Sequence, residues 1–275
     1  MPLNVVSNYA ANVAHRNLLK TDMQASASLA KLSIGKRVVS ARDDAASMAI
    51  GQRMNAEVQG LKQAVVNAGQ ANSMLQIADG AMNTISDILT RMKVLAMQSG
   101  SENLGETERG FLDTEFQALI GEIDRIAGDT DFNGTKLING DITTLTFKIG
   151  TGTVAAEDDL TFTMTAVTAS DLGVDGDTIT GVTDSATALT NINAAIDTLN
   201  TARADVGAAQ NRLDFASENL RVSIENAEAA RSTLLDLDLA AEMTTFTSKQ
   251  VLMQSGVAML AQANLMPQNL LRLLQ

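Results

Sequence analysis

The 275-residue chain has no cysteine and no tryptophan, and it has only one tyrosine, one histidine and two prolines. Without cysteine it forms no disulfide and offers no thiolate to a metal ion. With so few aromatic residues a thick globular core is hard to build, whereas thin, closely packed helices need only alanine, leucine and methionine. The prolines stand at positions 2 and 267, so no proline interrupts a helix between them. These scarcities favour long helices.

Basic residues are also few, with 20 lysines and arginines against 32 aspartates and glutamates. A nucleic-acid partner would require a basic stripe, and none is present. No apolar run is long enough to span a bilayer, so we expect no membrane partner either. Residues 1–20 interleave asparagines with apolar residues where a secretory signal requires a continuous apolar stretch. We therefore expect no cleaved signal peptide.

Three features resemble ligand or catalytic sites, and each is better explained without one. His15 has no second histidine or nucleophile to pair with. The glycine-rich stretch 150–155 is followed by three acidic residues, which would repel a phosphate, and a hairpin turn explains it better. Asp171, Asp175 and Asp177 lack the glutamate that closes a calcium loop, and a solvated acidic loop explains them better. We expect no catalytic, cofactor-binding or metal site.

Apolar residues recur at alternating spacings of three and four along most of the chain, which is typical of helices that pack as coiled coils. This spacing predicts helices over about 44–98, 106–127 and 189–234. In the helix predicted over 44–98, the apolar pattern slips by one residue after Met82. Asp43 and Asp44 stand at the start of this helix, where negative charge is favourable.

The third predicted helix has a polar position within its apolar seam. Residues that share it are Arg203, Gln210, Ser217 and Arg231. Polar residues at such a position can fix the register of a coiled coil at a cost in stability. They can equally lie at the edge of the seam with their polar ends in water. Both alternatives stand.

The middle of the chain, about 137–184, is rich in threonine, glycine and aspartate, and its apolar residues alternate with polar ones. It is too small for an independent sandwich, so we expect hairpins packed on the helices. Asn133 and Gly134, just before it, predict a tight turn.

The two ends of the chain are poor in charge and carry apolar stripes. Residues 239–275 contain only Glu242, Lys249 and Arg272 as charged side chains. A helix of this kind lacks the solvated face that a free helix requires, so we expect both ends to be covered by a partner. We call the following residues the assembly seam: Val6, Ala10, Val13, Leu29, Leu32, Leu239, Met243, Phe246, Met253, Val257 and Leu260.

The predicted fold is mainly α, a long antiparallel coiled-coil or helical bundle formed by the N- and C-terminal segments, with a small β-hairpin insert. We expect three parts. Residues 1–42 and 236–275 form an inner terminal-helix domain, residues 43–136 and 188–235 an outer helical bundle, and residues 137–187 a small exposed β-rich insert.

Several segments resemble bacterial flagellin. They are LAKLSIGKRVVSARDDAASMAIGQR at 29–53, TRMKVLAMQS at 90–99, EIDRIAGDTDFNG at 122–134, TLNTARADVGAAQNRLDFASEN at 198–219 and QSGVAMLAQANLMPQNLLRLL at 254–274. The matches follow the family's order and cover both terminal thirds of the chain. A hook-filament junction protein, related at its ends, is the alternative.

The resemblance implies a structural subunit, not an enzyme, that self-assembles into the helical flagellar filament used for swimming. Its partners would be copies of the same chain. It also implies extracellular localisation after type III export, with contacts to the export apparatus, a chaperone, and the hook-associated and cap proteins.

An innate immune Toll-like receptor recognises some flagellins through an arginine, a leucine and a glutamate. In this sequence the matching residues are Arg91, Leu95 and Glu115. The resemblance therefore implies a receptor contact at these three positions.

Overall fold

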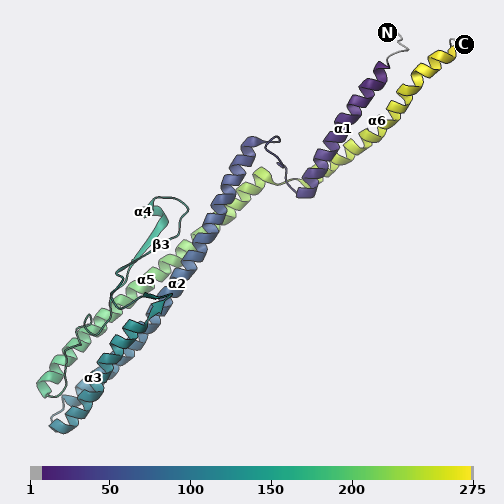
Figure 1. Ribbon diagram of the computed structural model, residues 1–275. Coiled ribbons are helices and arrows are strands. Elements are labelled where there is room, and N and C mark those ends of the chain that lie inside the picture. The colour runs from purple at the N-terminus through teal and green to yellow at the C-terminus, as the bar shows by residue number, and fades with distance from the viewer. Residues whose placement is uncertain (1–7, 274–275) are drawn as a thin grey trace. The chain divides into compact units, whose positions relative to one another are not determined.

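The computed structural model describes the backbone of residues 8–273 and the side chains of residues 8–265. Helices dominate this part of the chain, with four short strands between them (Figure 1). In order they are α1 (Tyr9–Ile34), α2 (Ala45–Ser99), α3 (Glu106–Asp129), β1 (Asp131–Phe132), β2 (Thr135–Lys136), β3 (Thr144–Lys148), α4 (Ala155–Asp158), β4 (Asp159–Thr163), α5 (Val182–Leu235) and α6 (Leu239–Leu273). The mainly α prediction with a small strand insert is confirmed.

The chain divides into two compact units. Unit 1 comprises Met1–Ala56 and Asn226–Gln275, and unit 2 comprises Glu57–Glu225. Because α2 and α5 are long, each contributes residues to both units. Among the described residues, no helix combines the length and the apolar character needed to cross a membrane.

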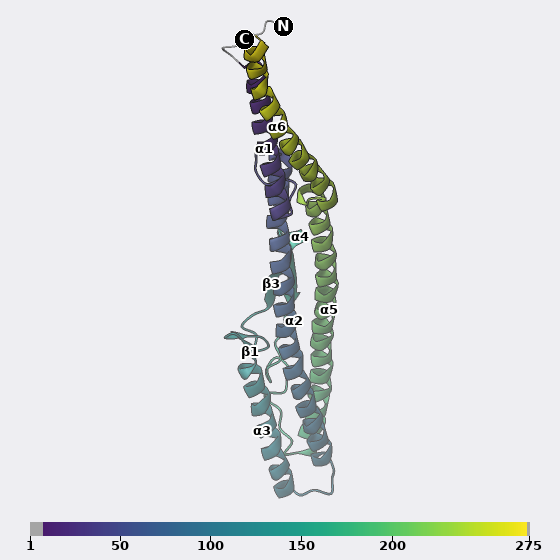
Figure 2. The same cartoon turned by 90° about the vertical axis from the view of Figure 1, so that its right-hand side faces the viewer.

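Unit 2 is a helical bundle in which α2 and α5 run side by side in opposite directions (Figures 1 and 2). Small and large side chains share its buried seam at unbroken spacings of three and four. On α2 these residues are Ala64, Ala68, Ala71, Leu75, Ala78, Met82, Ile85, Leu89, Met92, Ala96 and Ser99. On α5 they are Ser185, Ala188, Ile192, Ala195, Leu199, Ala202, Val206, Ala209 and Leu213. The slip expected after Met82 does not occur, because alanines continue the seam where larger residues are absent.

Helix α3 returns along α2 and places Phe116, Ile120 and Ile123 in the same core. The turn between the two helices is held by the buried guanidinium of Arg109, whose Nη2 donates to the carbonyl oxygens of Ser101 (2.9 Å) and Leu104 (3.2 Å). A buried charge of this kind is stable only when its donors are satisfied.

The insert differs from the predicted β-rich segment in its second half. Strands β3 and β4 form the predicted antiparallel hairpin, with Leu145 opposite Phe162. Residues 164–181 contain no strand; their backbone is anchored to α3, where the carboxylates of Asp113 and Asp124 accept hydrogen bonds from the Ile179 and Ala169 amides. This irregular segment still buries Val167, Leu172, Val174 and Ile179 in the core.

The tight turn predicted at Asn133 and Gly134 is confirmed. Both residues have positive φ, 52° and 81°, and they join β1 to β2. Two consecutive positive φ values match the twist of a two-residue hairpin, and asparagine and glycine adopt them at least cost.

Candidate assembly interface

In unit 1 the starts of α2 and α6 are each fixed by an aspartate. Asp44 caps α2, because its carboxylate accepts hydrogen bonds from the Ser47 amide (3.0 Å) and hydroxyl (2.5 Å). The Ser47 hydroxyl and amide therefore hold the Asp44 pKa below its ordinary value. Asp238 caps α6 in the same way, accepting from the amides of Ala240 and Ala241.

The segment that follows α1 and the segment that precedes α6 pair with each other. Lys36 and Asp236 form an isolated antiparallel β-bridge, the Arg37 amide donates to the Leu235 carbonyl (2.8 Å), and the Leu237 amide donates to the Gly35 carbonyl (3.2 Å). Gly35 ends α1 in the left-handed region, with φ of 72°. Both terminal helices therefore leave from one backbone-paired junction.

Helices α1 and α6 pack against each other in opposite directions (Figures 1 and 2). Their less exposed residues recur every three or four positions and define what we call the contact stripe. It comprises Ala11, Ala14, Leu18, Thr21, Ala25, Ser28 and Leu32 on α1, and Glu242, Phe246, Lys249, Met253, Gly256, Leu260 and Ala263 on α6. Many of these side chains are small or polar, so the pair closes tightly but buries little apolar area.

Two contacts toward the N-terminal end of α1 show how closely the helices approach. A Cβ atom on Gly256 would lie 3.2 Å from Leu18 Cδ1, which is tighter than an ordinary contact. The side-chain amide of Asn8 donates to the Ala263 carbonyl at 2.8 Å, and its carbonyl accepts from the Ala11 amide at 3.1 Å. Asn8 thus caps α1 and ties it to α6 at once.

Larger apolar side chains of both helices lie outside the contact stripe and are exposed. We call them the exposed apolar face: Tyr9, Leu19, Met23, Leu29, Leu239, Met243, Val251, Leu252, Val257, Met259 and Leu265. Exposed apolar residues are common singly, but so many on one helix pair mark an interaction surface.

The assembly seam expected from the sequence is divided between these two surfaces. Val13, Leu32, Phe246, Met253 and Leu260 are half-buried; all but Val13 belong to the contact stripe. Ala10, Leu29, Leu239, Met243 and Val257 are exposed. Val6 lies outside the described residues. The role of these residues in assembly stays a prediction.

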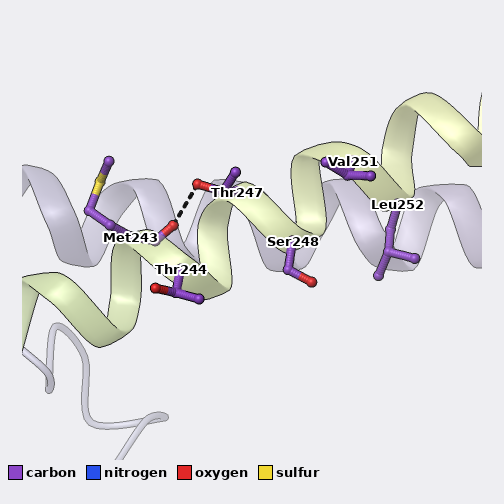
Figure 3. Close-up of a pocket in the computed structure, with 6 residues that line it drawn as sticks. All are labelled: Met243, Thr244, Thr247, Ser248, Val251 and Leu252. Atoms are coloured by element: carbon purple, nitrogen blue, oxygen red, sulfur yellow. Dashed lines mark hydrogen bonds between the residues drawn. The ribbon is translucent and has the colours of Figure 1, made fainter.

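Two open grooves on α1 and α6 include residues of the exposed apolar face. Figure 3 shows the first, where Met243, Thr244, Thr247, Ser248, Val251 and Leu252 lie along α6, with the Thr247 hydroxyl bonded to the Met243 carbonyl (2.8 Å). The second lies between α1 and α6 and is lined by Tyr9, Val13 and Leu18 from one helix and by Leu252 and Met259 from the other. Apolar grooves of this shape suit a further helix.

The polar positions of α5 are half-buried, and two of the four have partners on α2. Arg203 Nε lies 3.0 Å from the Asp79 carboxylate in unit 2, and Arg231 Nη1 donates to the Asn55 side chain at 3.0 Å in unit 1. A further contact, from Asn72 to Asp214 at 3.5 Å, was not expected from the sequence. Hydrogen bonds across a seam are what a role in register requires.

The proposed receptor residues lie on α2 and α3 of unit 2. Arg91 Nη2 is 2.6 Å from a Glu115 carboxylate oxygen, and both side chains are about half exposed. Leu95 is fully buried in the core. A partner at the surface of unit 2 would meet the ion pair, whereas the buried Leu95 is not accessible to it, so the contact expected at Leu95 is not available in this structure.

Charge is distributed unequally between the units. Unit 2 contains 25 of the 32 acidic residues but only half of the 20 basic ones. Unit 1, which bears the exposed apolar face, is therefore close to neutral. Low net charge removes a barrier to the approach of like surfaces.

Paired terminal helices that present apolar side chains, together with a helical bundle, are typical of a structural protein. Two family models match the chain: the bacterial flagellin N-terminal helical region over residues 5–143 and the bacterial flagellin C-terminal helical region over residues 189–274. The chain belongs to the bacterial flagellin family, and it is a subunit of the flagellar filament.

Relatives of the chain match it over almost its whole length. It is 38% identical over 274 residues to a flagellin of Halalkalibacterium halodurans, covering 98% of each chain. It is 34% identical over 281 residues to the flagellar filament 33 kDa core protein of Treponema phagedenis, again covering 98% of each. The crystal structure of Bacillus cereus flagellin superimposes with a TM-score of 0.50 at 31% identity, covering 56% of this chain and 88% of that one.

Proposed function

We propose that the exposed apolar face of α1 and α6, together with the assembly seam, is the surface through which copies of this chain pack in the filament. One observation carries the proposal: the two helices meet through small side chains while Leu29, Met243 and Val257 remain more than half exposed. Full burial of such a side chain contributes about 1.5–3 kcal/mol. Several per subunit, repeated along open head-to-tail contacts, would hold a polymer together.

Folding and assembly are coupled in this proposal. The contact stripe alone buries too little apolar area to offset the entropy of ordering two helices. Free subunits would then hold their terminal segments largely unfolded, and these segments would become helical when neighbouring copies cover the exposed apolar face.

A charged residue on the face tests the surface directly. Val257→Asp should leave unit 2 folded, as judged by the circular dichroism and thermal unfolding of the monomer, and should abolish filaments seen by electron microscopy. Val257→Ile is the matched control, because it keeps an apolar branched side chain, and it should polymerise like the parent. Normal filaments from Val257→Asp would refute the proposed surface.

The three-part division predicted from the sequence fits this mechanism. Residues 1–42 with 236–275 would form the inner assembly domain that lines the filament channel, residues 43–136 with 188–235 the outer bundle, and residues 137–187 the surface insert. The apolar content of α1 and α6, and the acidity of unit 2, support this order from inside to outside.

Membership of the flagellin family supports the remaining partners and the location. We infer export without a cleaved signal peptide through the flagellar apparatus, with a chaperone before export and with hook-associated and cap proteins at the filament ends. We also infer that the chain is structural and has no catalytic activity. The relatives reported above are flagellins and a filament protein, and nothing favours the hook-filament junction alternative.

Receptor recognition is proposed for the Arg91–Glu115 pair, while Leu95 is buried in the core of unit 2. If the filament buries this surface, only free subunits should activate the Toll-like receptor. Arg91→Ala should reduce signalling by monomer at least tenfold. Arg125→Ala, which removes an ion pair with Glu122 within α3, should not. Equal signalling by monomer and intact filament would contradict this proposal.

A further inference from the structure

Methionine is the only readily oxidised residue type that is abundant in this chain. The sequence contains 13 methionines, no cysteine, no tryptophan and a single tyrosine. Oxidation converts the flexible apolar thioether into a polar sulfoxide, and methionine sulfoxide reductases reverse it. Peroxide damage to this protein should therefore fall on methionines that solvent reaches.

The methionines differ sharply in exposure. Met82 and Met92 are completely buried in the unit 2 core, whereas Met243 is 51% and Met259 is 64% exposed. Both exposed residues lie on α6, and each lines one of the two apolar grooves of unit 1 (Figure 3 for Met243). Flexible, polarisable methionines are well suited to surfaces that must fit another helix.

We propose that Met243 and Met259 are sites of reversible oxidation that prevents a subunit from joining the filament. The inference rests on the proposed function, since it requires that other copies cover these grooves. A sulfoxide is far more polar than a thioether, so burying it against the apolar side chains of another copy would cost free energy. In the filament the same two sulfurs would be shielded, so the free subunit is the sensitive form.

The oxidant is a peroxide, of which hydrogen peroxide is the simplest. The thioether sulfur attacks one peroxide oxygen, the O–O bond breaks, and an S–O bond forms. The sulfur loses two electrons, the peroxide is reduced, and one water molecule leaves after proton transfer.

The test compares subunits before and after treatment with hydrogen peroxide. Monomer is oxidised, the sulfoxides are mapped by peptide mass spectrometry, and elongation of preformed filament seeds is followed by light scattering. We expect sulfoxides at Met243 and Met259 but not at Met82 or Met92, and elongation slower by on the order of tenfold. Treatment with sulfoxide reductases should restore it. Unchanged elongation despite sulfoxides at both positions would overturn the proposal.

Matched variants identify the responsible residues. After peroxide treatment, Met243→Leu with Met259→Leu should elongate close to the rate of the untreated parent. The control is Met97→Leu, which removes an exposed methionine (61%) of unit 2 that is not part of the exposed apolar face, and it should remain sensitive. Protection by the control variant instead of the double variant would overturn the proposal.

A third measurement does not depend on either variant folding. A partly oxidised parent preparation is polymerised and separated into filaments and unassembled subunits. Sulfoxide at Met243 and Met259 should be enriched in the unassembled fraction, and equal content in both fractions would overturn the inference. Failure of untreated protein to polymerise would instead count against the proposed function.

Discussion

Gly51 of α2 lies directly against the side chain of Leu235 on α5. A Cβ atom built on Gly51 would be 2.6 Å from Leu235 Cδ1 and within 3 Å of two further atoms of the same side chain. Glycine normally weakens a helix interior, so its presence here reflects the space that Leu235 occupies.

Alanine at this position tests the contact. Gly51→Ala should gain about 1 kcal/mol from helix propensity but lose about 1–3 kcal/mol from overpacking, for a net destabilisation on the order of 1 kcal/mol in urea unfolding of the monomer. Gly69→Ala is the control, because a Cβ there meets nothing within 4 Å. It should stabilise by about 0.5–1 kcal/mol. Equal stabilisation by Gly51→Ala and Gly69→Ala would mean that the Leu235 side chain moves aside at no cost in free energy.

The Asp79–Arg203 pair distinguishes the two interpretations of the polar seam. A double-mutant cycle with Asp79→Asn and Arg203→Gln should give a coupling of about 0.5–1 kcal/mol if the pair fixes register, which is the upper part of the range for partly exposed pairs. Asp205→Asn with Arg203→Gln is a control on the same helix, where no coupling is expected. A coupling near zero between Asp79 and Arg203 would favour the other interpretation, in which the polar side chains lie at the edge of the seam with their polar ends in water.

Stability at low pH should depend on Asp44. Hydrogen bonds from Ser47 lower the Asp44 pKa from its ordinary 3.8, so the ionised cap contributes stability above about that pH. The contribution is lost as pH falls through the lowered pKa of the folded state. Thermal unfolding of Asp44→Asn, which keeps a capping oxygen, should vary less with pH over this window than that of the parent. If Asp44→Asn leaves the pH profile of thermal unfolding unchanged, Asp44 is not a source of the pH dependence of stability.

Removal of residues 264–275 should leave a soluble monomer that does not polymerise. The deletion shortens α6 and takes away its last charge-poor turns, while unit 2 remains intact. Electron microscopy checks for filaments, and thermal unfolding checks that the bundle is retained. Pro267→Ala in the full chain tests separately whether the proline within α6 is needed for polymerisation. Filaments of normal length from the truncated chain would refute the prediction.

Periodicity alone was sufficient to predict the long helices, but it misplaced part of their seam. The spacing of the larger apolar residues alone predicts a slip of the α2 seam after Met82. In the structure Ala64, Ala71 and Ala78 continue it without a break. Alanine is common on exposed and buried helix faces alike, which is why composition does not reveal its position.

The segment 164–181 could not be predicted as an irregular covering of α3. Its register depends on Asp113 and Asp124, which lie 66 and 45 residues before the amides that they bind. Likewise, the division of the terminal helices into a contact stripe and an exposed apolar face depends on which side of α1 meets α6. Both ends were predicted to need a partner; which side chains remain available to it required the three-dimensional pairing.

Amide hydrogen exchange of monomer and filament, compared helix by helix, tests the coupling of folding to assembly most directly. The account predicts fast exchange throughout α1 and α6 in the monomer and strong protection of both in the filament. Amides of the unit 2 seam, such as those near Leu89 and Leu199, should be protected in both forms. Equal protection of α1 and α6 in monomer and filament would contradict the account.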